Sequence, residues 1–248
     1  MIPKIIHYCW FGRNPLPDSA LKCIESWRRF FPDYEIKRWD EDNFDVNIIT
    51  YTADAYAAKK YAFVSDYARF WILYQYGGVY FDTDVEVIKP MDDIIERGPF
   101  LGIEVETCDR LHHPMVAPGL GMAIEPGHEF YKKALDNYAK TVFRFENGGV
   151  QHESIVPMTT RLLVEAGLKP QNELQQVAGI WIYPKDYFNP FDDLTGRLYK
   201  TENTRTIHWY SATWQHRNPL RKWLSRFSHR VFGMHLHALK KRLRNNLK

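Results

Sequence analysis

The chain has 248 residues, enough for one sizeable hydrophobic core, and its 45% hydrophobic and 25% charged residues are ordinary for a soluble globular protein. The sequence contains no run of about 18 apolar residues, which argues against a transmembrane helix, and its three scattered cysteines argue against a disulfide framework or a thiolate metal site. The net charge of +3 hides an asymmetry: residues 203–248 carry eleven Lys or Arg and no Asp or Glu, whereas the remainder has 22 basic and 30 acidic residues and a net charge of −8.

The first third of the chain alternates predicted strands and helices. The apolar segment KIIHYCWF predicts an opening strand and is too short and polar for a signal peptide. Asp18 or Ser19 is expected to cap a helix that ends before Pro32, and YEIKRW alternates like a second strand. Helical spacing resumes at about Thr52 and continues to the glycine pair at residues 77–78, where a third strand begins.

The pattern continues after Pro90. A short helix is predicted near MDDIIER, strands near PFLGIEV and GLGMAIE, helices over GHEFYKKALDNYAK and ESIVPMTTRLLVEAG, and late strands near VAGIWIYP and TRTIHWY. Strands that alternate with helices over most of the length predict an α/β sheet with helices on both faces. Ligands of such sheets bind at the carboxyl ends of the strands.

One of these carboxyl ends carries two aspartates, in the stretch GGVYFDTDVEVIKP. Successive strand residues point to opposite faces, so Asp82 and Asp84 are expected to project to the same side. Two neighbouring carboxylates repel each other unless something offsets their charge, and a hard divalent cation such as Mg²⁺ or Mn²⁺ would do so. The alternative is a turn with solvated side chains.

The helix before this strand also carries polar groups among aromatic and aliphatic residues. Asp66 and Arg69 share a face at spacing i and i+3, with Ser65 beside them. An inward-facing ionic pair on an otherwise apolar helix favours a functional site, and the alternative is a structural ion pair within the helix.

Three functions fit these residues. A cation that also holds a diphosphate describes a nucleotide-dependent transferase. Asp-x-Asp after an apolar strand also fits a haloacid-dehalogenase-type phosphatase, in which Asp82 would be the nucleophile and Asp84 the acid/base. Asp192 and Asp193 could imitate the later acidic pair of that family, but residue 82 is late for a motif that normally opens its domain. The third alternative is a non-catalytic sugar- or membrane-binding protein.

Three segments together resemble the bacterial family-32 glycosyltransferases of capsular polysaccharide synthesis, which are distant relatives of the clostridial glucosylating toxins. The segments are IPKIIHYCWFG, AFVSDYARFWILYQYGGVYFDTDVEV and IHWYSATW, and the resemblance covers roughly residues 2–214. It implies a GT-A-type fold with a mixed, mostly parallel sheet, a nucleotide-sugar donor, a divalent metal (Mn²⁺ or Mg²⁺) and retention of anomeric configuration.

The resemblance also assigns roles near the aspartates. Asp84 resembles the direct metal ligand, and Asp82 resembles the residue that touches the donor and supports the metal. Asp66 and Arg69 resemble the pair that binds the donor sugar and the transferred centre, so Asp66, Arg69 and Asp82 are the expected catalytic residues. Tyr80 is expected to pack, with a donor contact as the alternative.

Further donor contacts are expected at both ends of the resemblance. Tyr8 or Trp10 of the first strand should lie against the nucleobase. Near the C-terminus the family shows two histidines followed by Ser-Trp, where this chain has His208, Thr213 and Trp214. His208 is the expected second metal ligand, with Ser211, Thr213 or a water as alternatives, and Trp214 is an expected donor contact.

The expected organisation is a catalytic domain over residues 1–214 and a basic amphipathic tail of helices over residues 215–248. Residues 217–248 would suit an anionic membrane surface and therefore a lipid-linked acceptor, and the alternative is a helix packed on the body. No recognised nucleic-acid-binding motif accompanies the charge, so nucleic acid is not expected as a partner. The predicted protein is a cytoplasmic hexosyltransferase, peripheral on the inner face of the cell membrane, and UDP-sugars are expected ahead of GDP-sugars as donors.

Overall fold

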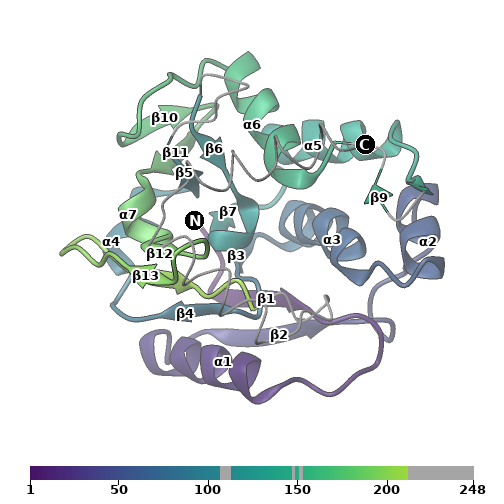
Figure 1. Ribbon diagram of the computed structural model, residues 1–248, viewed down its shortest axis with the longest axis horizontal. Coiled ribbons are helices and arrows are strands. Elements are labelled where there is room, and N and C mark those ends of the chain that lie inside the picture. The colour runs from purple at the N-terminus through teal and green to yellow at the C-terminus, as the bar shows by residue number, and fades with distance from the viewer. Residues whose placement is uncertain (107–112, 147–148, 151–152, 212–248) are drawn as a thin grey trace, which may run out of the picture.

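The computed structural model describes residues 1–106, 113–146, 149–150 and 153–211 (Figure 1). The predicted tail over residues 215–248 and the predicted contacts at Thr213 and Trp214 lie outside the described residues. Among the described helices, none combines the length and apolar character needed to cross a bilayer.

A central sheet organises the molecule. It has eight strands in the order β10 (Gln175–Val177), β11 (Ile180–Tyr183), β5 (Phe100–Val105), β7 (Met122–Ile124), β3 (Gly78–Tyr80), β1 (Ile5–Cys9) and β2 (Glu35–Trp39), with β6 (Met115–Val116) paired to β5. β1 is parallel to β2 and β3, and β11 is parallel to β5. β7 is antiparallel to both β3 and β5, so β1, β2, β3, β5 and β11 all point the same way. The sheet is therefore mixed and mostly parallel, as predicted.

Three small antiparallel pairs lie outside this sheet. They are β4 (Val85–Val87) with β14 (Thr206–His208), β12 (Phe191–Asp192) with β13 (Arg197–Leu198), and β8 (Phe145–Glu146) with β9 (Gly149–Val150). The first pair matters for function because it places the predicted late strand beside the segment that follows the aspartates.

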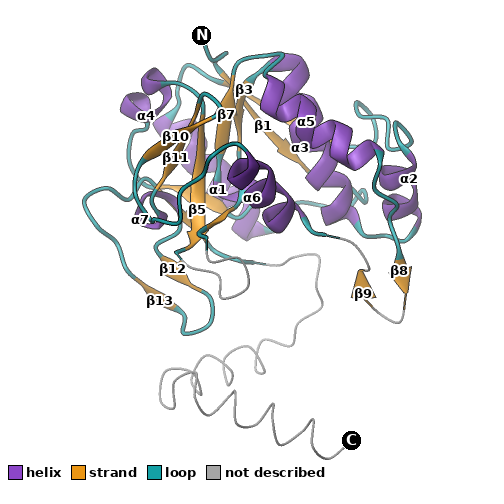
Figure 2. Ribbon diagram, turned by 90° about the horizontal axis from the view of Figure 1, so that it is seen from above, coloured by secondary structure: helices purple, strands orange, loops and turns teal. Residues whose placement is uncertain are grey.

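The predicted helices on both faces of the sheet are confirmed. The helices are α1 (Asp18–Phe30), α2 (Thr50–Ala57), α3 (Tyr61–Tyr76), α4 (Asp92–Arg97), α5 (Glu129–Ala139), α6 (Ile155–Glu165), α7 (Lys185–Phe188) and the 3-10 turn η1 (Pro118–Leu120). Alternate strand residues enter two separate cores: Val79 and Phe81 pack with residues of α1, α4 and α7, whereas Tyr80 packs with α2, α3, α5 and α6. Figure 2 shows the strands between these two groups of helices.

Two local predictions are wrong. The helix expected from about Thr52 to the glycine pair is two helices, because Lys59 between α2 and α3 has a φ of 56° that no helix contains. The expected cap at Asp18 or Ser19 is also absent: Asp18 is already helical, the extended Pro17 occupies the cap position, and no side chain caps it.

A buried histidine ties α3 to the sheet immediately before the aspartates. His7 Nδ1 accepts a hydrogen bond from Trp39 Nε1 at 3.0 Å, and Nε2 donates to the Gly77 carbonyl at 3.0 Å. Burial lowers the pKa of His7 to about 4, so the ring is neutral. A Cβ on Gly78 would lie 2.6 Å from the Ile5 carbonyl oxygen, so the close approach of β3 to β1 requires glycine there.

Candidate functional site

The predicted site residues lie where the topology of the sheet places ligands. Because β1, β3 and β5 run in one direction, their carboxyl ends share an edge of the sheet. Asp82 follows β3, and Asp84 directly precedes β4. The ladder between β4 and β14 pairs Val85 with His208, which brings His208 beside Asp84 across 124 positions of sequence.

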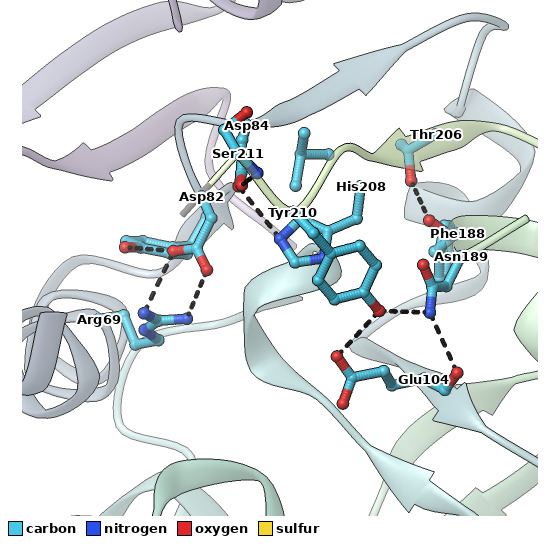
Figure 3. Close-up of polar contacts among 12 residues, drawn as sticks. Arg69, Asp82, Asp84, Glu104, Phe188, Asn189, Thr206, His208, Tyr210 and Ser211 are labelled. Carbon is cyan, nitrogen blue, oxygen red and sulfur yellow. Dashed lines mark hydrogen bonds and ion pairs between the residues drawn. The ribbon is translucent and has the colours of Figure 1, made fainter. Parts of the chain in front are cut away.

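The two aspartates are in a turn and do not continue the strand. β3 ends at Tyr80, and the Val85 amide donates to the Asp82 carbonyl at 3.0 Å. The turn breaks the strand alternation from which a common direction was expected, so the pleat of a strand does not set the directions of these two side chains. The Asp82 carboxylate pairs with Arg69, whereas the Asp84 carboxylate pairs with His208 (Figure 3).

Arg69 holds the first carboxylate in a two-pronged ion pair. Its Nη1 lies 3.2 Å from Asp82 Oδ2 and its Nη2 lies 3.1 Å from Asp82 Oδ1. Nη2 also donates to Asp66 Oδ1 at 3.1 Å, so one guanidinium holds two carboxylates. The side chain of Arg69 is only 6% exposed. We call Asp66, Arg69 and Asp82 the arginine cluster.

Burial sets the charge of this cluster. Desolvation raises the pKa of Asp66 to about 7, against the lowering effect of Arg69. Burial alone would lower the pKa of Arg69, but Asp82 and the other nearby groups raise it above its usual range, so the guanidinium stays charged. The cluster therefore keeps a fixed cation between one carboxylate and a second that changes protonation near neutral pH.

A backbone without a side chain lies against this cluster. A Cβ on Gly119, which belongs to η1, would collide with Asp82 Oδ2 and lie 3.3 Å from Arg69 Nη1. The Asp82 amide also faces the Gly119 carbonyl at 3.4 Å. Glycine at this position therefore lets η1 approach the Arg69–Asp82 pair.

The second carboxylate is held from the C-terminal side of the described chain. Asp84 Oδ1 lies 3.1 Å from His208 Nε2, and Asp84 Oδ2 accepts from the Ser211 amide at 2.8 Å. Burial alone would raise the pKa of Asp84, but His208 and the Ser211 amide lower it. Burial alone would lower the pKa of His208, but Asp84 raises it. We call Asp84, His208 and the Ser211 amide the histidine pair.

A divalent cation fits the histidine pair. Bonds of about 2.1 Å at a right angle separate two ligand atoms by roughly 3.0 Å, close to the 3.1 Å between Asp84 Oδ1 and His208 Nε2. His208 Nδ1 is buried and has no hydrogen-bond partner among the described residues. Those residues contain no group of three or more His, Cys, Asp or Glu arranged to hold a metal, so the histidine pair by itself offers two ligands.

The other residues predicted to contact the donor, Tyr8, Trp10 and Tyr80, lie in different surroundings. Tyr8 is 7% exposed and its ring packs edge-on to Trp27 in the core. Trp10 follows β1, is partly exposed, and donates through Nε1 to the Asn14 carbonyl at 2.7 Å. Tyr80 packs as expected: its ring lies under Arg69, and its hydroxyl donates to Asp82 Oδ1 at 3.1 Å.

Three polar residues near His208 were not predicted. The Tyr210 ring centroid lies 4.1 Å from that of His208, and its hydroxyl donates to Glu104 Oε1 at 3.0 Å. Asn189 Nδ2 donates to the Tyr210 hydroxyl at 2.7 Å. The one signal in the sequence was the position of Glu104 near the end of an apolar strand, since strand ends carry the ligand sites of such sheets.

Known proteins are similar to parts of this chain. Residues 17–101 match the family described as a glycosyltransferase sugar-binding region containing the DXD motif. Inositol phosphoceramide mannosyltransferase 1 of Schizosaccharomyces pombe is 28% identical over 155 residues, which cover 58% of this chain and 45% of that protein. An uncharacterized glycosyltransferase of Acanthamoeba polyphaga mimivirus is 32% identical over 109 residues, covering 40% of this chain and 42% of that protein. The chain thus spans less than half the length of these relatives.

A solved structure, the PaToxG glycosyltransferase, overlaps with a TM-score of 0.47 at 20% identity and covers 66% of this chain and 69% of its own. The matched range includes Asp66, Arg69, Asp82 and Asp84, and Asp82-Thr83-Asp84 has the Asp-x-Asp pattern that the family description names. Residues 17–101 of this chain are therefore similar to the DXD-containing sugar-binding region of the glycosyltransferases.

Proposed function

We propose that the protein is a metal-dependent, retaining glycosyltransferase that moves a hexosyl unit from a nucleotide-sugar to a glycan or lipid-linked acceptor in surface polysaccharide synthesis. The observation that carries this proposal is that the arginine cluster and the histidine pair are adjacent: only Thr83 separates Asp82 of the first from Asp84 of the second. UDP-sugars are expected ahead of GDP-sugars as donors. The fungal relative is named a mannosyltransferase, so the donor panel also includes a GDP-sugar of mannose.

The arginine cluster suits the donor sugar. Carboxylates of the cluster can accept hydrogen bonds from sugar hydroxyls, while Arg69 neutralises the charge they would otherwise leave in a buried place. Arg69 can also offset negative charge that develops as the nucleoside diphosphate leaves. Asp66, Arg69 and Asp82 therefore keep the donor-binding and catalytic roles expected of them.

The histidine pair suits the diphosphate end of the donor. Asp84 and His208 would hold Mn²⁺ or Mg²⁺, which would supply positive charge at the diphosphate. Because Asp84 Oδ2 accepts a hydrogen bond from the Ser211 amide, Oδ1 is the oxygen that would bind the metal. That Asp82 also supports the metal stays a prediction, since both of its oxygens accept hydrogen bonds from Arg69 or Tyr80.

The phosphatase alternative is less well supported. To act as a phosphorylated nucleophile, Asp82 would have to give up the ion pair that both of its oxygens make with Arg69. Asp192 accepts hydrogen bonds from the Leu194 amide and the Thr195 hydroxyl in its own hairpin. Asp192, one member of the acidic pair expected for a phosphatase, is thus accounted for by a local turn.

The acceptor and location remain part of the proposal. The named fungal relative acts on a lipid with an inositol phosphate head group, and residues 217–248 are rich in basic residues. We infer that these residues bring the enzyme to the inner face of the cell membrane, where a lipid-linked acceptor would lie. Flotation with anionic and neutral vesicles, with and without residues 217–248, tests this, and equal flotation of both forms would contradict it.

A thermal-shift panel tests class and donor together. UDP- and GDP-sugars are added with Mn²⁺ to the wild type, to Asp84→Ala, and to Asp136→Ala, which removes an exposed ion pair with Lys132 as a matched control. The proposal expects Mn²⁺-dependent stabilisation by at least one nucleotide-sugar in the wild type and the control but not in Asp84→Ala. Hydrolysis of simple phosphate esters with no response to any nucleotide-sugar would favour the phosphatase, and binding without turnover would favour a non-catalytic protein.

A further inference from the structure

The residues Glu104, Asn189 and Tyr210 form a second polar cluster that the donor site does not use. In Figure 3, His208 and Tyr210 lie between the arginine cluster and Glu104. Asn189 is 2% exposed, and its Nδ2 donates both to the Tyr210 hydroxyl and to the Glu104 carbonyl at 3.0 Å. We call these three residues the glutamate cluster.

Glu104 is a half-buried carboxylate with capacity for a ligand. It lies near the carboxyl end of β5, which runs in the same direction as β1 and β3 and so ends at the same edge of the sheet. Oε1 accepts from Tyr210, whereas Oε2 accepts no hydrogen bond from the described residues, and none of their cations pairs with Glu104. A half-buried carboxylate without a cation partner is costly unless other donors bind it.

The backbone is strained where it fixes this carboxylate. Tyr210 has a φ of 50°, which is an outlier for an aromatic residue. The strain turns the chain between His208 and Ser211, both of which contact Asp84, and carries the Tyr210 hydroxyl to Glu104. Such strain is typical of a side chain held in place for a ligand.

The charge of the region narrows the kind of ligand. Glu104 can only accept hydrogen bonds, and its Oε1 already accepts one from the Tyr210 hydroxyl. An anionic group placed against Glu104 would be repelled, whereas neutral hydroxyls can donate to a carboxylate. Two adjacent hydroxyls on a ring would suit the two oxygens of one carboxylate.

We propose that Glu104, held by Tyr210 and Asn189, is the acceptor subsite and binds neighbouring hydroxyls of a neutral polyol ring, either a sugar or an inositol. This inference rests on the proposed glycosyltransferase function. Glu104 is a binding and specificity residue here, and Tyr210 is a positioning residue that acts through it.

The test separates donor chemistry from acceptor binding. Glu104→Gln keeps an oxygen for the Tyr210 hydroxyl but loses the charge, so a purely structural role predicts no change. Glu106→Gln, the same change two residues away on an exposed side chain, is the matched control. Each enzyme is assayed with Mn²⁺ and the nucleotide-sugar that stabilises the wild type in the thermal-shift panel. Water alone is the first acceptor, and octyl glucoside, octyl galactoside, octyl mannoside, myo-inositol and inositol phosphoceramide follow.

Glu104→Gln is expected to raise the KM for the acceptor at least tenfold, since a hydrogen bond to a charged group contributes about 1.5–3 kcal/mol. Donor hydrolysis by water should stay within about twofold of the wild type and of Glu106→Gln. Tyr210→Phe keeps the ring against His208 and should raise the acceptor KM about fivefold.

An unchanged acceptor KM in Glu104→Gln, or a parallel loss of donor hydrolysis, overturns the acceptor subsite while the glycosyltransferase stands. An unchanged KM in Tyr210→Phe overturns the positioning role. Donor hydrolysis without transfer to any probe overturns the polyol class. A wild type that neither binds nor hydrolyses any nucleotide-sugar overturns the proposed function, and the acceptor subsite with it.

Discussion

The arginine cluster and the histidine pair are built in opposite ways. The arginine cluster joins a helix to the strand that follows it, spans only residues 66–82, and holds its own countercharge. The histidine pair joins residues 84 and 208, and its geometry also suits a cation from outside the chain. The arginine cluster is therefore expected to form whenever α3 meets β3, whereas the histidine pair requires the late segment and, on the proposed function, a metal.

The largest effect is expected from Asp84→Ala. Removing the carboxylate should reduce transfer at least 10³-fold, roughly 4 kcal/mol of transition-state stabilisation, and abolish Mn²⁺ binding measured by electron paramagnetic resonance. Because the arginine cluster contains its own countercharge, its contribution to stability should remain. Full transfer by Asp84→Ala in the presence of metal would refute the site.

Arg69→Met should act on the arginine cluster, and its main effect should be on the stability of the protein. It leaves the buried Asp66 and the partly buried Asp82 without their cation, so the free energy of unfolding should fall by about 3–5 kcal/mol. Urea denaturation measures this loss, with Arg13→Met, which breaks an exposed pair with Asp42, as the control. A loss below about 1 kcal/mol would show that the cluster is not preformed.

The raised pKa of Asp66, about 7, makes the arginine cluster sensitive to pH. Between about pH 4 and pH 7 the native state holds a proton that the unfolded state has lost, so stability should fall as pH rises through this window and level off above it. Asp66→Asn should remove roughly 2–4 kcal/mol of this dependence. Unfolding of both proteins between pH 4.5 and 8 measures the difference, and parallel profiles would contradict the assignment.

Tyr80→Phe should have the smallest effect. It removes one hydrogen bond to Asp82 and keeps the ring under Arg69, so it should cost about 1 kcal/mol of stability. Donor binding measured by thermal shift should weaken slightly while Mn²⁺ affinity is unchanged. A large change in Mn²⁺ affinity would mean that the two halves are coupled through Asp82.

The two halves also differ in how much of them could be predicted. Asp66 and Arg69 were evident from helical spacing and a polar pair on an apolar helix. The position of His208 came from a family resemblance, since no local pattern relates residue 208 to residue 84. The turn that holds Asp82 and Asp84 was not predicted, because strand periodicity does not reveal where a strand ends.

The glutamate cluster could not be predicted from the sequence, for a related reason. The cluster forms only through tertiary packing, since 106 positions separate Glu104 from Tyr210. The positive φ of Tyr210 could not be predicted either, because the residue is neither glycine nor asparagine, the types that usually adopt it. Propensity likewise gave no warning of the break at Lys59. What could be predicted were the apolar strands and amphipathic helices, because each is specified by its own residues.

The ladder between β4 and β14 has a consequence for how this chain tolerates insertions. Three residue pairs hold it, and the last of them sets His208 opposite Val85. Because side chains alternate along a strand, a slip of one residue would turn the imidazole away and offer an isoleucine, Ile207, to Asp84 in its place. Length changes between residues 193 and 203 should therefore be tolerated only when β14 can recover its register, so the spacing of a surface hairpin becomes a determinant of metal affinity.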